Sequence, residues 1–301
     1  MTAEIILHHY DTSPFSEKVR VMFGLKGLAW RSVIQPVIMP KPDLIPLTGG
    51  YRRIPVMQIG ADVYCDTQVI LAELEARRPK PPVVHASDWA VNLWADRLFF
   101  QATVAVVFGE IGDHVPREFL DDREKLSGRP FDLQAMKAVA GPMKAQWRAQ
   151  ATWIEQGLAD GDFLGGSKPS LADVAAYMNI WWLGRAAPGV AATLLQGLSR
   201  TQAWRDRIVA IGHGERKEMA PTEALNIAMT SSPGSAPPSD PHERFKPGDA
   251  VAVRADDYGR DPVEGSLVAV TADRIVVARE CGELNLVQVH FPRVGYLLTA
   301  A

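Results

Sequence analysis

Short apolar runs and helical periodicity alternate over the first eighty residues. Residues 4–10 form a short run rich in isoleucine and leucine, which predicts a strand. Ser13 and Pro14 then suit the N-cap and first position of a helix whose apolar residues recur at helical spacing as far as Gly27. Further strands are expected at 30–34, 55–59 and 62–65, the last two as a hairpin, and a second helix at 67–77. The order βαβ, irregular segment, ββα predicts a small mixed sheet covered by helices.

A proline-rich break at 78–86 separates this region from one in which only helical periodicity remains. Helices are expected near 88–108, 133–158, 171–183 and 201–211. The segment 171–183 is apolar on nearly every side, which predicts a buried helix at the centre of its domain. The pattern therefore predicts an α/β domain at 1–80 and an all-helical domain at 87–229.

A third pattern begins after residues 230–243, which have the Pro, Ser and Gly content of a linker. Short strands are expected at 250–254, 266–270, 274–279 and 284–291, which predicts a small all-β module of the SH3-like barrel kind at 244–301. We expect it to fold independently and not to be needed for ligand binding. Because such a length is close to the lower limit for a self-sufficient core, the alternative is a module that leans on the helical domain and covers the mouth of the site.

Composition narrows the function classes. The chain has 301 residues and a net charge of -3. From Arg244 onward there are seven Lys or Arg and eight Asp or Glu residues, so the last module has no excess of positive charge and a nucleic-acid partner is not expected. Cys65 and Cys281 are too few for a disulfide framework, which favours a reducing compartment. No signal peptide or long uncharged apolar stretch is evident, so a cytoplasmic protein without a membrane partner is expected. No His, Cys or Asp cluster has metal-ligand spacing.

The segment SPFSEKVR, at residues 13–20, is the first candidate for chemistry. A helix N-terminus presents free N–H groups and a partial positive charge, which stabilise a thiolate, and the Ser13 hydroxyl can donate one more hydrogen bond to it. Ser16 offers a second hydroxyl one turn later. The alternative is that Ser13 is only an N-cap.

Two further segments can be interpreted either as ligand-binding elements or as purely structural ones. Ile54-Pro55 precedes a strand, where a cis peptide would leave the Ile54 backbone free to pair with an extended peptide; the alternative is a trans proline at a strand edge. Asp66-Thr67 begins a helix, where its carboxylate suits an amine and its N–H groups suit a carboxylate; the alternative is an ordinary cap.

Taken together in this order and spacing, the segments resemble the soluble glutathione transferase superfamily. SPFSEKVR is similar to its first helix, RRIPVMQIGADVYCDTQVI to its cis-proline, hairpin and glutathione clamp, and GGSKPSLADVAAY to the start of its buried helix, with Ser170 and Asp173 as a capping pair. The resemblance covers residues 4–215. It implies a thioredoxin-like domain followed by an all-helical domain.

The resemblance also implies roles for individual residues and partners. Ser13, or Ser16 in its place, would hydrogen-bond the thiolate of glutathione, which is the implied cosubstrate. The backbone at Ile54-Pro55 would pair with the cysteinyl unit, and Asp66 and Thr67 would hold the γ-glutamyl end. The residue that would hold the glycyl carboxylate of glutathione is not placed by the resemblance, and Lys41 is only a guess for it. A serine at position 13 disfavours the cysteine-type oxidoreductase branch.

Two functions follow as hypotheses. The first is an enzyme that stabilises the glutathione thiolate for attack on a small electrophile, or for an isomerase, lyase or peroxidase step. The second is a non-catalytic binding or interaction protein on the same scaffold, since one fold hosts many functions. In either case the resemblance implies a homodimer.

Overall fold

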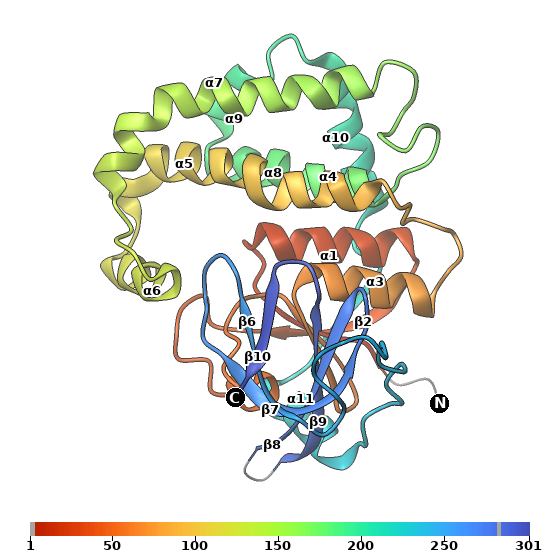
Figure 1. Cartoon of the computed structure of the whole chain (residues 1–301). Helices are drawn as coiled ribbons and strands as arrows, with labels where there is room; N and C mark the ends of the chain where they lie inside the picture. The colour runs from red at the N-terminus through yellow and green to blue at the C-terminus, as the bar shows by residue number, and fades with distance from the viewer. Residues whose placement is uncertain (1–3, 282–283) are drawn as a thin grey trace.

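A thioredoxin-like unit begins the chain, as predicted. The computed structural model describes residues 4–281 and 284–301 (Figure 1). The elements of this unit are β1 (Ile6–His9), α1 (Pro14–Leu25), β2 (Ala29–Ile34), α2 (Ile45–Thr48), β3 (Val56–Ile59), β4 (Asp62–Cys65) and α3 (Thr67–Arg77). β1 pairs parallel with β2 and antiparallel with β3, and β3 pairs antiparallel with β4. This is the predicted mixed sheet, and α1 and α3 begin at the side-chain caps Ser13 and Asp66.

The second unit is helical, as predicted. Its elements are α4 (Asp88–Trp94), the π-helical turn η1 (Ala95–Phe99), α5 (Phe100–Ile111), the 3-10 turn η2 (Gly112–His114), α6 (Arg117–Ser127), α7 (Leu133–Gly157), α8 (Leu171–Ala186), α9 (Pro188–Leu194) and α10 (Ser199–Ile211). α8 is buried over most of its length and begins with the expected capping box between Ser170 and Asp173. Lys18 of α1 is fully buried and joins the two units, because its Nζ donates to Asn92 Oδ1 at 2.9 Å and to Asp96 Oδ1 at 2.8 Å.

The continuous helical run Asp88–His114 is long and apolar enough to cross a membrane, by length and composition alone. In the fold it packs on α7 and α8 and contributes Phe99, Val106 and Val107 to the core of the helical unit. Its apolar character is therefore explained by the core that it helps to form.

The chain returns to the first sheet after α10, which the sequence pattern did not predict. β5 (Glu215–Glu218) pairs parallel with β2, and α11 (Pro221–Thr230) packs Ala224 and Ala228 into buried positions against the sheet. The expected all-helical region at 87–229 thus ends near Ile211. β5 has the sequence ERKE and its side chains are mostly exposed, so it carries no apolar alternation from which a strand could be predicted.

The last part of the chain is rich in strands, as predicted, with one strand more than expected. Its elements are β6 (Ala250–Ala255), β7 (Val263–Val270), β8 (Arg274–Cys281), β9 (Leu284–Pro292) and β10 (Tyr296–Ala300). Together they are called the C-terminal module below. Neighbouring strands follow the order β10-β6-β7-β8-β9, and β9 then pairs parallel with β4 of the first unit. The ten strands of the described residues therefore form one sheet, which Figure 1 shows in the lower half of the molecule.

The C-terminal module shares a hydrophobic core with the first unit. Val251, Leu267 and Val289 of the module and Leu47 and Val63 of the first unit belong to one cluster of side chains with almost no exposed surface. Segment 36–51, α11 and the hairpin β3–β4 cover one side of this core. This differs from the independently folding module expected from the sequence. The apolar face of a short sheet is not self-sufficient, and here it is completed by residues from the start of the chain.

The shared core predicts one cooperative unit. Leu267→Ala removes a side chain that is 1% exposed and should lower the free energy of unfolding by about 2–5 kcal/mol. Hydrogen exchange should show the same loss in β1, a strand of the first unit, because both unfold together. Leu286→Ala, at a position that is 43% exposed on β9, is the control and should leave β1 nearly unchanged. Loss of protection confined to β6–β10 would mean that the module unfolds separately.

Two adjacent buried histidines predict acid sensitivity. His8 accepts from Gln35 at Nδ1, at 3.2 Å, and donates from Nε2 to Gln58 Oε1, at 2.9 Å, as a neutral ring does. Burial lowers the pKa of His8 to about 4, and burial together with the charge of Arg20 lowers the pKa of His9 to about 3. In the unfolded chain both titrate near 6.5. The unfolded state therefore binds more protons below pH 6.5, and stability falls as the pH falls toward those folded values.

Substitution of His8 tests this dependence. His8→Gln keeps a donor toward Gln58 and removes the titration, so between pH 7 and pH 5 it should lose about 2 kcal/mol less stability than the unmodified chain. Urea unfolding at several pH values is the measurement. His114→Gln, at an exposed position, should follow the unmodified chain. Parallel losses in His8→Gln and the unmodified chain would contradict the assignment.

Candidate functional site

Ser13 lies at the start of α1, where its side chain is 2% exposed. Its Oγ accepts a hydrogen bond from the backbone N–H of Ser16 at 3.1 Å, so it is an N-cap, which was the plain alternative. Ser16 is fully buried, and its Oγ has no hydrogen-bond partner among the residues described by the structure. The two serines are adjacent, as predicted, but neither hydroxyl lies open to solvent.

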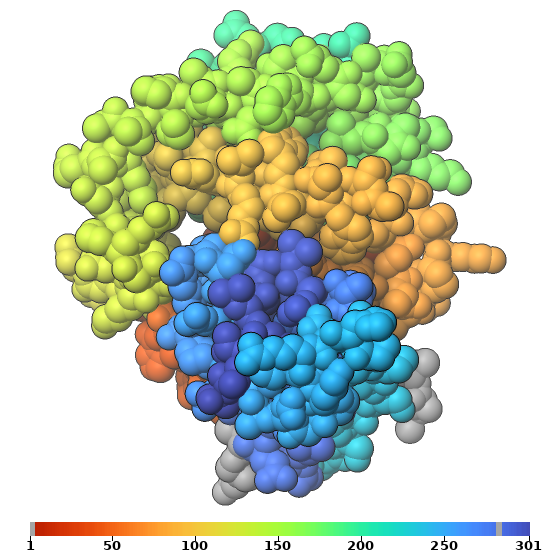
Figure 2. Space-filling view, in the orientation of Figure 1, coloured from red at the N-terminus to blue at the C-terminus, as the bar shows by residue number. Residues whose placement is uncertain are grey.

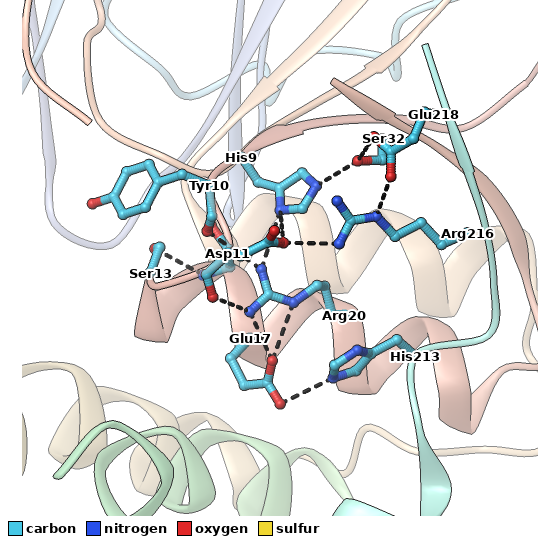
Figure 3. A network of polar contacts seen from close by, with 11 residues as sticks. His9, Tyr10, Asp11, Ser13, Glu17, Arg20, Ser32, His213, Arg216 and Glu218 are labelled. Carbon is cyan, nitrogen blue, oxygen red and sulfur yellow. Dashed lines mark hydrogen bonds and ion pairs between the residues drawn. The ribbon is translucent and has the colours of Figure 1, made fainter. Parts of the chain in front are cut away.

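A mostly buried network of charged groups holds the start of α1, and no pattern in the sequence indicated it (Figure 3). Glu17 Oε2 accepts from Arg20 at 2.8 Å, and Glu17 Oε1 pairs with His213 Nε2 at 3.0 Å. Arg20 also donates to His9 Nδ1 at 3.1 Å. Burial opposes ionisation of Glu17, but the hydrogen bond from His213 and the charge of Arg20 outweigh it and lower the pKa of this carboxyl. The network fixes α1 against the chain that leaves the helical unit.

Asp66 is the N-cap of α3 and has a positive φ of 91°, in a region that non-glycine residues rarely occupy. One carboxylate oxygen, Oδ1, accepts from the backbone N–H of Gln68 at 2.9 Å. The other, Oδ2, accepts from the hydroxyl of Tyr296 at 3.1 Å. Burial and the adjacent charge of Asp66 raise the pKa of Tyr296 well above its usual value, so the hydroxyl stays protonated and can donate. The carboxylate predicted to hold a ligand thus holds the C-terminal module.

The segment before β3 contacts the same module. The Ile54–Pro55 peptide bond is cis. The guanidinium of Arg53 lies over the ring of Tyr258 at 3.9 Å and pairs with the carboxylate of Asp257. Both partners belong to the loop between β6 and β7. Arg53 is therefore fixed by a loop from the far end of the chain.

A small cavity remains where the predicted residues meet. Its volume is about 50 Å³, and it is lined by Ile54, Asp66 and Thr67 from the first unit and by Asp257, Tyr258 and Tyr296 from the module. Pockets for small molecules usually have volumes of about 300–1,000 Å³, so this one holds only a few water molecules. Ser13 is not among its lining residues. The structure thus brings Ile54, Pro55, Asp66 and Thr67 together. The C-terminal module covers them, which was the alternative expected for the module from the sequence.

Ion pairs and a backbone contact hold the covering loops on the helical unit as well. Arg97 of η1 donates to Asp256 Oδ1 at 2.8 Å and lies 3.3 Å from Asp257 Oδ2. The backbone N–H of Gly259 donates to the carbonyl of Leu126, at the end of α6, at 2.7 Å. The sequence did not indicate Arg53, Arg97, Tyr258 or Tyr296 as site residues, because only the long-range pairing of β9 with β4 brings the module here.

Other residues considered from the sequence have structural environments. Nζ of Lys41 donates to the backbone carbonyls of Pro36 and Ile38, and this side chain is almost fully buried. Cys65 is buried, and burial, together with the charge of Asp66, raises the pKa of its thiol well above its usual value, so it is not a reactive thiolate. The side chain of Cys281 lies outside the described residues. Within residues 4–281 and 284–301 no three His, Cys, Asp or Glu side chains converge as metal ligands.

The contact between Asp66 and Tyr296 can be measured by a double-mutant cycle. Asp66→Asn keeps the capping oxygen and removes the charge, and Tyr296→Phe removes the hydroxyl. Because a hydrogen bond to a charged acceptor contributes about 1.5–3 kcal/mol, we expect a coupling free energy of unfolding of about 1 kcal/mol or more. Strictly additive effects would mean that the two groups do not meet in solution.

Comparisons with known proteins agree with this architecture. The family model described as the glutathione S-transferase N-terminal domain matches residues 7–82, and that of the C-terminal domain matches residues 114–207. A solved GST-like protein from Pseudomonas syringae is 35% identical, with a TM-score of 0.81 over 99% of this chain and 100% of that chain. That similarity therefore includes the C-terminal module.

Two further relatives cover less of the chain. FtsZ-localized protein A of Caulobacter vibrioides is 25% identical over 189 residues, which are 60% of this chain and 77% of the relative. The solved structure of FzlA from C. crescentus is 22% identical, with a TM-score of 0.53 over 78% of this chain and 96% of that chain, and supports the fold alone. The beta-etherase LigF from Sphingobium sp. strain SYK-6 is similar at the level of the fold, with 19% identity, a TM-score of 0.53, and coverage of 70% of this chain and 96% of that chain.

Proposed function

The chain belongs to the glutathione S-transferase superfamily, and on that basis we propose that it acts as a binding protein on this scaffold and not as a glutathione-dependent transferase. The observation that carries the proposal is the hydrogen bond from the Tyr296 hydroxyl to Asp66 Oδ2. In the resemblance, Asp66 would hold the γ-glutamyl end of glutathione. Here the carboxylate is already engaged by the protein's own C-terminal module.

Space and solvation support the same proposal. Glutathione would have to displace the stacked and ion-paired loop at Asp257-Tyr258 in order to reach Ile54, and the free volume is only about 50 Å³. The Arg53–Asp257 pair is partly buried, with side chains 12% and 21% exposed, so breaking it leaves charges that water compensates only in part and costs free energy. Glutathione would have to recover that free energy before any net binding, so we expect its affinity to be weak.

The buried position of Ser13 adds to this. A hydroxyl that assists a thiolate must meet the sulfur within hydrogen-bond distance. Ser13 is 2% exposed and Ser16 is fully buried, which argues against the transferase hypothesis in the described conformation.

The relative in Caulobacter vibrioides is named for its localization with FtsZ. We therefore favour a protein-binding role for this chain over thiol chemistry. A cytoplasmic location and a homodimer remain our proposals. Any dimer has to use a surface other than the outer edge of β4, because β9 covers that edge.

Calorimetry with reduced glutathione tests the proposal on the full-length chain. We expect dissociation constants weaker than about 1 mM, less than ~4 kcal/mol of binding free energy, and no conjugation of an aryl halide above the uncatalysed rate. The double variant Tyr258→Ala/Tyr296→Ala removes the two rings that cover Ile54 and Asp66. It should therefore bind glutathione more tightly than the unmodified chain.

Val294→Ala is the matched control, because Val294 lies two residues from Tyr296 and is 56% exposed. It should behave like the unmodified chain. Micromolar binding by the unmodified chain, together with turnover that Ser13→Ala reduces at least about tenfold, would restore the transferase hypothesis.

A further inference from the structure

The sheet of the described residues ends in two strands of opposite character. At one edge lies β5, with the sequence ERKE, and at the other lies β10, whose one neighbour among the described residues is β6. An edge strand presents a row of unpaired backbone groups, and proteins commonly protect such a row with charged side chains. β5 has that protection. Residues 294–301, which include β10, have the sequence VGYLLTAA without a charged side chain, so this edge is open to another strand.

The pairing with β6 determines which backbone groups of β10 are free. The N–H of Asp256 donates to the carbonyl of Gly295 at 3.0 Å, in line with the register of β10 on β6. Because alternate residues of an antiparallel pair exchange hydrogen bonds, the odd-numbered residues of β10 bond to β6. The backbone groups of Leu298 and Ala300 therefore point away from β6, toward the place that a further strand would occupy.

The side chains at this edge are apolar, and several are exposed. Leu297 is 46% exposed, Ala300 is exposed, and Leu298 on the opposite face packs partly buried against the shared core. Figure 2 shows the end of the chain, in the darkest blue, at the surface of the module. Gln68 Nε2 of α3 donates to the carbonyl of Val294 at 3.3 Å, so the contact from the first unit is made just before β10 begins.

The sequence of β10 is complementary to itself when two copies run antiparallel. The large side chains of Tyr296 and Leu297 begin the strand, and the small ones of Thr299 and Ala300 end it. With a two-fold axis at Leu298, Tyr296 would lie opposite Ala300 of the partner subunit. Leu297 would lie opposite Thr299 of the partner subunit. Directly opposed side chains interact across a strand pair, and a closed two-fold interface requires such self-complementarity.

We propose that two copies of this chain associate through the open edge of β10, as an antiparallel β10–β10 pair that joins their two sheets into one. This rests on the homodimer of the proposed function and names the C-terminal module as its interface. The surface lies apart from the covered residues at Asp66. A pair of five-residue strands gives an interface at the low end of stable sizes, so the expected dissociation constant is about 1–100 μM.

Sedimentation velocity of the full-length chain between about 1 and 200 μM tests the interface. Leu297→Lys places a charge inside the apolar strand pair and should weaken association at least about tenfold. Leu286→Lys is the matched control, because Leu286 is 43% exposed on β9, away from the proposed interface, and its substitution should leave association unchanged. Thermal unfolding of each variant separates lost association from lost folding.

A mixture of two variants tests the antiparallel register. Thr299→Glu alone should also weaken association, and it serves as the second variant if Leu297→Lys does not fold. Mixed in equal amounts, the two variants should associate as a heterodimer more tightly than either does alone. The two substituted positions then lie opposite each other and carry opposite charges.

A crosslink tests the position of the axis. In a hydrogen-bonded antiparallel pair the Cα atoms lie about 5.5 Å apart, within the range of a disulfide. Leu298→Cys should therefore form an intermolecular disulfide on mild oxidation. The unmodified chain, which carries Cys65 and Cys281, is the control for this measurement.

Three outcomes would overturn the proposal. The first is a chain that stays monomeric up to about 200 μM. The second is a dimer that both charged variants leave unchanged, which would keep the homodimer but place it on another surface. The third is a mixture that associates no better than its components. Calorimetry with glutathione on Leu297→Lys should match the unmodified chain, so that failure of this interface is distinguishable from failure of the proposed function.

Discussion

The parallel pairing of β9 with β4 is the interaction on which the rest of the structure depends. Val63 of β4 lies opposite Val289 of β9, and both are fully buried in the core that the first unit shares with the C-terminal module. The pairing places the loops before β7 and β10 over the N-terminus of α3. It also removes the open edge of β4, a row of backbone groups that would otherwise attract another strand. Site coverage and sheet stability thus have one cause.

Local sequence patterns predicted most of the fold. Period-two and helical spacing located the first sheet and α8, and Ser13, Asp66 and Ser170 are caps as their residue types suggest. β5 was missed because ERKE is charged throughout and lies at the edge of the sheet, where charge protects the strand instead of burying it. The sequence did not predict that the strands of the C-terminal module join the first sheet. An apolar strand pattern indicates that a face is buried, but it does not indicate which other part of the chain covers that face.

The sequence predicted the residues that the first unit contributes to the candidate site, but not those that the C-terminal module contributes. Ile54, Pro55, Asp66 and Thr67 follow motifs of short range and do meet. Tyr258, in the loop before β7, and Tyr296, the first residue of β10, have no signal of their own, since each is a single aromatic residue that acquires its position only through pairing between distant strands.

That long-range pairing has a consequence for synthesis of the chain on the ribosome. His290 of β9 contacts Asp62 of β4, and the two are 228 residues apart in sequence. At about 5–20 residues per second, β4 emerges on the order of ten seconds or more before its partner strand exists. During that interval the nascent chain has an exposed sheet edge and an uncovered apolar face, so protection of the growing chain by chaperones, or transient cover by the helical unit, becomes part of how this protein is made.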